Sequence, residues 1–202
     1  MTAKKRSKWL FFPRFVVFFV IVYLLWHFTA PIANKPFTFL GGNIVMLFDG
    51  LDLTKAIKAS GKFIVVVYEP TTDGKPLTLD YKGFTFNTVF LVALIMAVPN
   101  VDYKLRLKIL LLGLVILYPI QVFRLVIYVF NHYCQNMRRK SGATIYPLFI
   151  HNAIGYTDRV LIRIDGQIIP IVIWAGLFYY YEWHKMFIKF KQAKTSVFSK
   201  PE

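Results

Sequence analysis

ILLLGLVILYPIQVFRLVIYVF, residues 109–130, decides the fold of this chain, because it is a long apolar run with one charged residue, Arg124. At about 1.5 Å of rise per helical residue the run spans roughly 30 Å, which matches the hydrocarbon core of a bilayer. It therefore predicts a membrane helix at 109–131. A guanidinium inside such a helix costs about 2.5–3.5 kcal/mol at mid-bilayer, so we expect a partner or a function to retain Arg124.

The composition is that of an integral membrane protein. Hydrophobic residues make up 56% of the 202 residues and charged residues 17%, with a net charge of +15. The basic residues cluster at the ends of apolar runs, where they flank membrane helices, and this pattern argues against nucleic acid as a partner. One cysteine, Cys134, excludes an internal disulfide, and four scattered histidines have no metal-ligand spacing. We expect no metal and no cofactor.

Three further apolar segments, 9–30, 83–98 and 160–183, predict an all-α integral membrane protein with about four membrane helices. The first is too long and aromatic for a signal peptide, which predicts an uncleaved helix. Basic residues before position 9, in the loop 99–108 and in the tail 184–202 predict that both termini are cytoplasmic. The protein is then expected to cross the plasma (inner) membrane several times as a single domain.

Two segments are predicted on the extracytoplasmic side. In the segment 31–82, the runs FIVVVY and LTLDY with Asp73-Gly74 between them predict a β-hairpin at 63–81. The apolar spacing of Ile44–Ile57 predicts a helix lying along the interface. The second segment, 132–159, is predicted to be a loop, and its Arg138-Arg139-Lys140 run is expected to face solvent or phospholipid.

Three positions converge on that predicted outer face: the start of the helix at 83, Arg124, and His151 in the loop that follows. Here the chain resembles the exosortase and archaeosortase family, membrane-embedded cysteine transpeptidases that process carboxy-terminal sorting signals of exported proteins. The resemblance covers Leu77–Tyr181. The matching motifs are Gln121-Val122-Phe123-Arg124 and His151-Asn152-Ala153-Ile154-Gly155. It implies that Arg124 and His151 are catalytic and that Asn87, Gln121 and Asn152 line the site.

The chain departs from this family at the nucleophile. Where the family has its cysteine, this chain reads Gly83-Phe84-Thr85-Phe86-Asn87-Thr88. A thiolate is the nucleophile of that chemistry, and Thr85 or Thr88 would need a strong adjacent base to replace it. Cys134 is the other candidate nucleophile. The departure predicts a catalytically degenerate protein that binds the carboxy-terminal helix of an exported client or a partner, as a homo- or hetero-oligomer.

Three alternatives remain open from the sequence. One is an active membrane peptidase or transpeptidase that uses Cys134 or a threonine. Another is a transporter or channel subunit in which Arg124 contacts an anion. In the third, Arg124 is a structural charge that pairs with a carboxylate such as Asp165 or reaches the headgroups, and His151 is bonded only to backbone.

Overall fold

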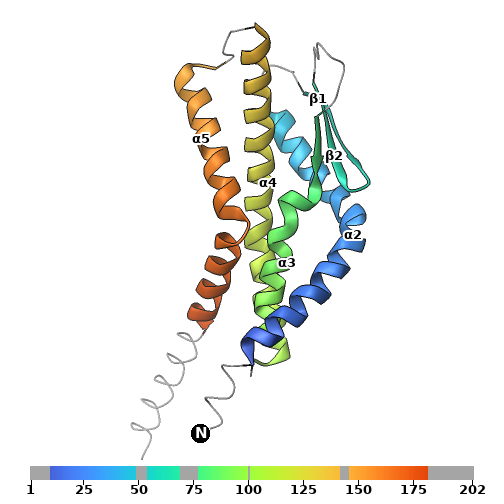
Figure 1. The fold of residues 1–202 in the computed structure, drawn as a ribbon, viewed down its shortest axis with the longest axis vertical. Helices are drawn as coiled ribbons and strands as arrows, with labels where there is room; N and C mark the ends of the chain where they lie inside the picture. The colour runs from blue at the N-terminus through green and yellow to red at the C-terminus, as the bar shows by residue number, and fades with distance from the viewer. Residues whose placement is uncertain (1–9, 49–53, 69–76, 100, 142–145, 182–202) are drawn as a thin grey trace, which may run out of the picture.

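The computed structural model describes residues 10–48, 54–68, 77–99, 101–141 and 146–181. These residues form a helical membrane protein with a small three-stranded antiparallel sheet, which confirms the predicted fold class. Helix α4 (Tyr103–Ser141) runs through the middle of the molecule, and α5 (Leu148–Asp165) lies along one side of it. Helix α2 (Phe11–Phe48), helix α3 (Tyr81–Ala97) and the sheet lie on the other side (Figure 1).

The first helix is longer than its apolar run predicts. The membrane helix expected at 9–30 continues through Pro31 and Pro36 as α2 to Phe48. A proline inside a helix removes one hydrogen bond and bends the helix without always ending it. Figure 1 shows α2 changing direction near its middle, so that its second half leans back toward α4. The start of the predicted extracytoplasmic segment, 31–48, is therefore part of this helix, although the sequence predicts a helix there only from Ile44.

The sheet has the order β1-β2-β3, with β1 at Thr54–Ser60, β2 at Phe63–Tyr68 and β3 at Leu77–Asp80. The antiparallel pairing of β2 with β3 confirms the predicted hairpin, whereas its turn at Asp73-Gly74 lies outside the described residues. The interfacial helix predicted at Ile44–Ile57 is wrong from residue 54 onward, where β1 pairs with β2. Gly61, at φ +56°, supplies the left-handed residue that their two-residue turn requires.

A buried asparagine joins this sheet to the first helix. Asn34 of α2 donates from Nδ2 to the carbonyl oxygens of Gly61 and Phe63, at 2.9 and 2.8 Å. Its own oxygen accepts a hydrogen bond of 2.7 Å from the Thr38 hydroxyl. The two carbonyl groups lie at the β1–β2 turn, and Asn34 and Thr38 are buried, so the polar side chain is satisfied where water is excluded.

Helix α3 follows β3 without a connecting loop. The Asp80 carboxylate accepts a hydrogen bond of 3.0 Å from the backbone N–H of Lys82 and so caps the helix. The predicted helix at 83–98 thus begins two residues earlier, at Tyr81. Its buried side chains pack on both α2 and α4, and they are Tyr81, Phe84, Thr85, Asn87, Val89, Leu91, Ala93, Leu94, Ile95 and Ala97.

The predicted loop at 132–159 is wrong, because most of its described residues are helical. Residues 132–141 continue α4, and residues 148–159 belong to α5. Gln135, Asn152 and Arg159 are exposed on these helices, and Asp158 is buried against α4, so the polarity of the stretch does not mark a loop. The helix predicted at 160–183 is also divided: α5 ends at Asp165, and a second helix, Ile168–Tyr181, continues at 62° to it.

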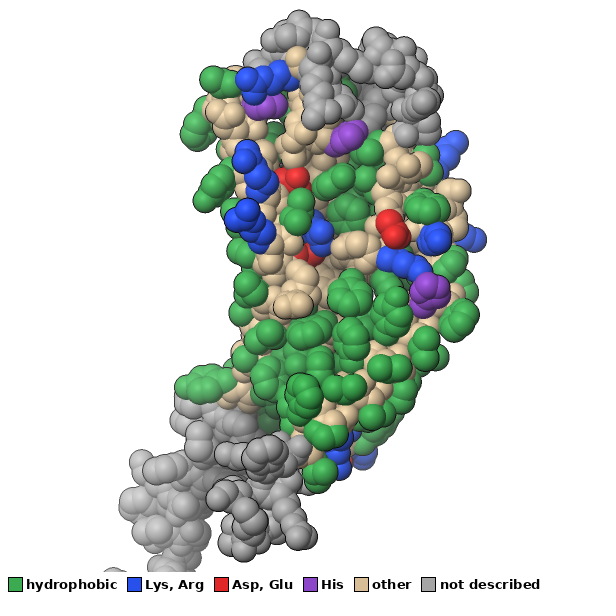
Figure 2. Space-filling model, viewed as in Figure 1, with side chains coloured by type: hydrophobic (Ala, Val, Ile, Leu, Met, Phe, Trp, Pro, Cys, Tyr) green, Lys and Arg blue, Asp and Glu red, His purple; other side chains and the backbone are tan. Residues whose placement is uncertain are grey.

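Two helices of the described residues are long and apolar enough to cross a bilayer, within Phe11–Leu47 and Tyr103–Gln135. A third span results if α5 and Ile168–Tyr181 count as one bent element, and α3 is a shorter apolar helix. In Figure 2, hydrophobic side chains cover the lower half of the described surface, while charged side chains of both signs gather above it. The side of the membrane on which each end lies remains a prediction.

Candidate functional site: a polar network at the junction of three helices

Arg124 lies on α4 where that helix meets α3 and the end of α5. Its Nη1 forms an ion pair with the Asp165 carboxylate and donates to the carbonyl oxygen of Gly83 at 3.1 Å. The guanidinium also lies over the Phe84 ring, 5.1 Å from its centroid. The Arg124 side chain is 14% exposed and that of Asp165 is fully buried. The charge is therefore held by a carboxylate, a carbonyl and an aromatic face.

Two amides extend this ion pair into a network across α3 and α4. Asn87 donates to the second oxygen of Asp165 at 2.6 Å. Gln121 donates to the Asn87 oxygen and, at 2.8 Å, to the Thr88 hydroxyl. The spacing explains the convergence, since residues three or four apart share one face of a helix. On α4, Gln121 and Arg124 are three residues apart and therefore lie side by side; on α3, Gly83 and Asn87 are four apart and do the same.

The ion pair and the hydrogen bonds of the network stabilise the charges of Arg124 and Asp165, as in a structural rather than a reactive site. Asp165 accepts from Arg124 and Asn87, so its carboxylate is both neutralised and hydrogen-bonded. Breaking such a buried pair by removing one partner costs about 3–5 kcal/mol, because a charge is left without compensation. The Arg124 Nε is buried without a hydrogen-bond partner in the described part of the chain.

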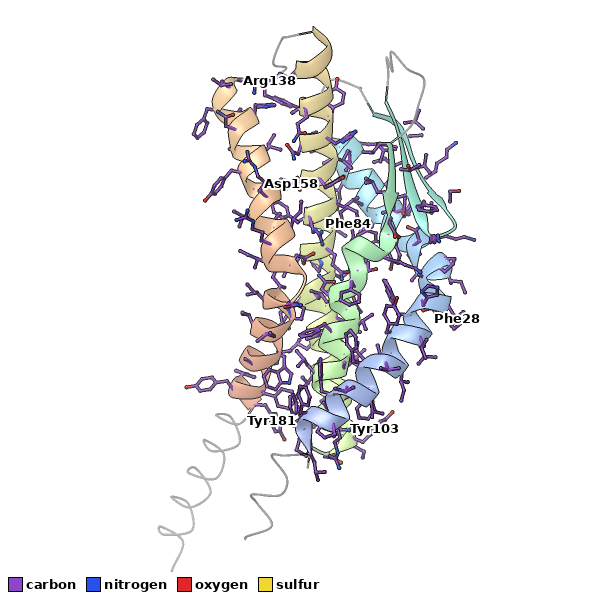
Figure 3. All side chains as sticks on the ribbon, viewed as in Figure 1. Phe28, Phe84, Tyr103, Arg138, Asp158 and Tyr181 are labelled. Atoms are coloured by element: carbon purple, nitrogen blue, oxygen red, sulfur yellow. The ribbon has the colours of Figure 1, made fainter. Side chains whose placement is uncertain are left out.

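A second buried polar pair connects α4 and α5 farther from the membrane helix α3. Asn131 of α4 donates at 2.6 Å to one oxygen of Asp158 on α5, and Gln135 donates to Asn131 at 3.1 Å. The other Asp158 oxygen is buried without a hydrogen-bond partner in the described part of the chain. Figure 3 shows Asp158 on the side of α5 that faces α4. Asn131 follows Arg124 by seven residues and Asp158 precedes Asp165 by seven, so the two antiparallel helices pair polar residues at a heptad interval.

The structure brings together Arg124, Asn87, Gln121 and Thr88 of the residues singled out from the sequence. The pairing of Arg124 with Asp165, one of the alternatives left open there, is confirmed. The Asn131–Asp158 pair was not predicted. The heptad spacing of polar residues within helical segments was the signal that could have indicated it.

The other candidates lie apart from this network. The Thr85 hydroxyl donates to the Tyr81 carbonyl of its own helix at 3.1 Å. Cys134 is 4% exposed and lies ten residues past Arg124 on α4, about 15 Å along the axis. His151 and the exposed Asn152 are in the first two turns of α5, and His151 is about 21 Å of helical rise from Asp165. No group of three metal-ligating side chains occurs among the described residues.

An apolar groove lies beside the network, between the second half of α2, the middle of α4 and the first half of α5. It encloses about 550 Å³, within the range of sites that bind small molecules or side chains. We call it the α2–α4–α5 groove. Its lining consists of Leu40, Ile44, Tyr118, Pro119, Val122, Phe123, Val126, Ile127, Phe130, Tyr146, Ile150 and Ile154.

Comparison with known proteins gives one finding. The family model described as exosortase H-associated membrane protein matches residues 5–180 of the chain. No curated protein and no solved structure matches it. Because the family match covers most of the sequence, the chain belongs to the exosortase H-associated membrane proteins.

Proposed function

We propose that this exosortase H-associated membrane protein is a non-catalytic subunit, which binds an exosortase within the membrane and supports its work on the carboxy-terminal sorting signals of exported proteins. The family description supports a membrane protein of the exosortase system. The observation that carries the non-catalytic role is the Arg124 network. Its guanidinium is held by Asp165, Gly83 and Phe84, and the network contains no thiol.

The chemistry of the candidate residues agrees with this role. A cysteine transpeptidase needs a thiolate within reach of a base and of groups that stabilise the developing charge. Here Cys134 is buried about 15 Å of helical rise from Arg124, and His151 lies on a different helix near its start. Thr88 accepts from Gln121, and the Thr85 hydroxyl is bonded within its own helix. Within the described residues, neither the Thr85 nor the Thr88 hydroxyl forms a hydrogen bond with a side chain that could act as a base.

The active-enzyme alternative requires a rearrangement that brings a nucleophile to Arg124. The transporter alternative has less support, because Asp165 compensates the Arg124 charge and leaves little attraction for an anion. A non-catalytic subunit requires neither a free nucleophile nor a free cation. It requires a rigid scaffold, which the buried ion pair and its two amides supply.

The test is co-expression of this chain with its exosortase and a client that bears a sorting signal. We expect the two membrane proteins to co-purify, and we expect Cys134→Ala, Thr85→Val and Thr88→Val to leave client processing unchanged. Replacing the exosortase's own catalytic cysteine should abolish processing while co-purification persists. Processing in the absence of the exosortase, or its loss in Cys134→Ala with normal protein abundance, would contradict the proposal.

A further inference from the structure

We propose that the α2–α4–α5 groove receives a membrane-spanning helix of the exosortase where that helix leaves the bilayer. This inference rests on the proposed function, because it names the surface through which the association would occur. The argument has three steps: where the bilayer ends on this molecule, which part of the groove lies beyond that level, and what can fill an apolar groove there.

The first step is a band without charged side chains. On α4 no charge occurs between Lys108 and Arg124, which are separated by about 24 Å of helical rise, and Arg106 lies about 27 Å from Arg124. On α3 no charge follows Lys82 up to Ala97, the last residue of the helix, about 22 Å away. These lengths are close to the thickness of a hydrocarbon core.

Charged residues of different helices lie close together at each end of this charge-free band. At one end, Arg14 and Arg106 line a common depression, and Tyr180 and Tyr181 lie beside Lys104 and Lys108. At the other end, Lys82 contacts the His27 ring at 2.8 Å, and Arg124 pairs with Asp165. Figure 3 shows Tyr103 and Tyr181 at the lower end of the described helices, with Arg138 far above at the upper end. The bilayer therefore ends near Arg124.

The second step places the groove across this boundary. Tyr118, Pro119 and Val122 lie within the band on α4, whereas Val126, Ile127 and Phe130 lie beyond Arg124. The α5 lining residues, Ile150 and Ile154, precede Asp165 by 11 residues or more, which places them farther from the band. The groove thus starts in the hydrocarbon and continues above it.

The third step concerns the occupant. Acyl chains can cover the part of the groove inside the band but not the part above it. Exposing that upper part to water costs a free energy of about 25 cal/mol per Å² of apolar surface. An apolar helix that crosses the bilayer and continues past its surface covers both parts. The exosortase is the membrane protein with which the family is associated, so we assign the groove to one of its helices.

A matched pair of isoleucines on α5 tests this assignment. Ile150 lines the groove and is 42% exposed, while Ile162, which is 47% exposed, does not line it. Each position is replaced by the photo-crosslinking residue p-benzoylphenylalanine, and separately by lysine, in the full chain co-expressed with the exosortase. Both side chains are exposed, so neither replacement buries a charge in the isolated protein.

We expect the crosslinker at position 150 to trap the exosortase and the crosslinker at position 162 to trap little of it. Ile150→Lys should reduce co-purified exosortase at least about tenfold, and Ile162→Lys should change it less than about twofold. Crosslinks from position 150 to the client, to a second copy of this chain or to lipid alone would overturn the assignment. If the unmodified chain fails to co-purify with the exosortase, the proposed function itself fails.

Discussion

At the scale of single residues, the Arg124–Asp165 pair shows why a charge can persist in the membrane region of this chain. A buried pair gains little over well-packed apolar residues, because both ions lose their hydration. Once both charges are present, however, each needs the other. Asp165 is fully buried and would otherwise keep only its hydrogen bond from Asn87. The pair therefore explains the retention of Arg124 without any catalytic role.

This explanation predicts a rescue. Arg124→Met should lower the free energy of unfolding by about 3–5 kcal/mol, because it leaves the Asp165 carboxylate buried and uncompensated. The double variant Arg124→Met/Asp165→Leu should recover most of that loss, since it removes both charges. Denaturant titration in mixed micelles measures the effect, with Arg138→Met, an exposed arginine of the same helix, as the control. A double variant that folds normally but no longer supports client processing would show that the Arg124 charge acts directly.

At the scale of elements, a buried polar side chain of α2, Asn34, joins that helix to the sheet. Asn34 bonds two carbonyl oxygens on either side of the β1–β2 turn, and its oxygen is occupied by Thr38. Three strands alone form a marginal unit, so their attachment to a helix matters for their stability. The neighbouring buried side chains of this attachment are Phe37 on α2 and Ile64 and Val66 on β2.

We therefore expect Asn34→Ala to loosen the sheet more than the membrane helices. The change removes three hydrogen bonds and takes this donor from two carbonyl oxygens, which should lower the local free energy of opening by about 1–3 kcal/mol. Hydrogen exchange of the β1 and β2 amides measures this effect. Asn43→Ala, on an exposed position of the same helix, is the matched control. Equal exchange in the two variants would mean that apolar packing alone holds the sheet.

The elements that were predicted correctly are those with a strong local signal. The apolar run at 109–130 and the β-branched FIVVVY segment each specify their own structure. The strand TKAIKAS lacks such a signal and forms because β2 offers it a partner. Likewise, polar residues such as Asn131 and Asp158 are typical of a loop when only the sequence is considered. The packing of α4 against α5, which the sequence does not show, buries them within helices.

The site likewise contains one residue with a strong sequence signal and several contacts that arise only from tertiary packing. Arg124 was found from the sequence because a charge in an apolar run is conspicuous. Its contacts with Asp165 and Gly83, and the hydrogen bond of Asn87 to the same carboxylate, join α4 to the end of α5 and to α3, and only the fold brings these residues together. The distance between Arg124 and His151 could not be predicted either, since it depends on 132–159 being two helices rather than a flexible connection.

At the scale of the whole molecule, the charge-free band divides the chain into a membrane part and a projecting part. The projecting part contains the second half of α2, the sheet, the end of α4 and α5, above the level of Arg124. The residues beyond the opposite end of the band include Arg14, Lys104 and Arg106. Because basic residues favour the cytoplasmic side, the projecting part is expected outside the cytoplasm.

Single-cysteine labelling in intact cells tests this orientation. Lys58 on β1 and Lys104 at the start of α4 are exposed lysines at opposite ends of the band. In a Cys134→Ala background, we expect a membrane-impermeant maleimide to label Lys58→Cys in intact cells, and Lys104→Cys only after the cells are opened. Labelling of Lys104→Cys alone in intact cells would invert the orientation and place the Arg124 network and the groove on the cytoplasmic side. Labelling of both positions would contradict the band itself, because a bilayer between them must protect one.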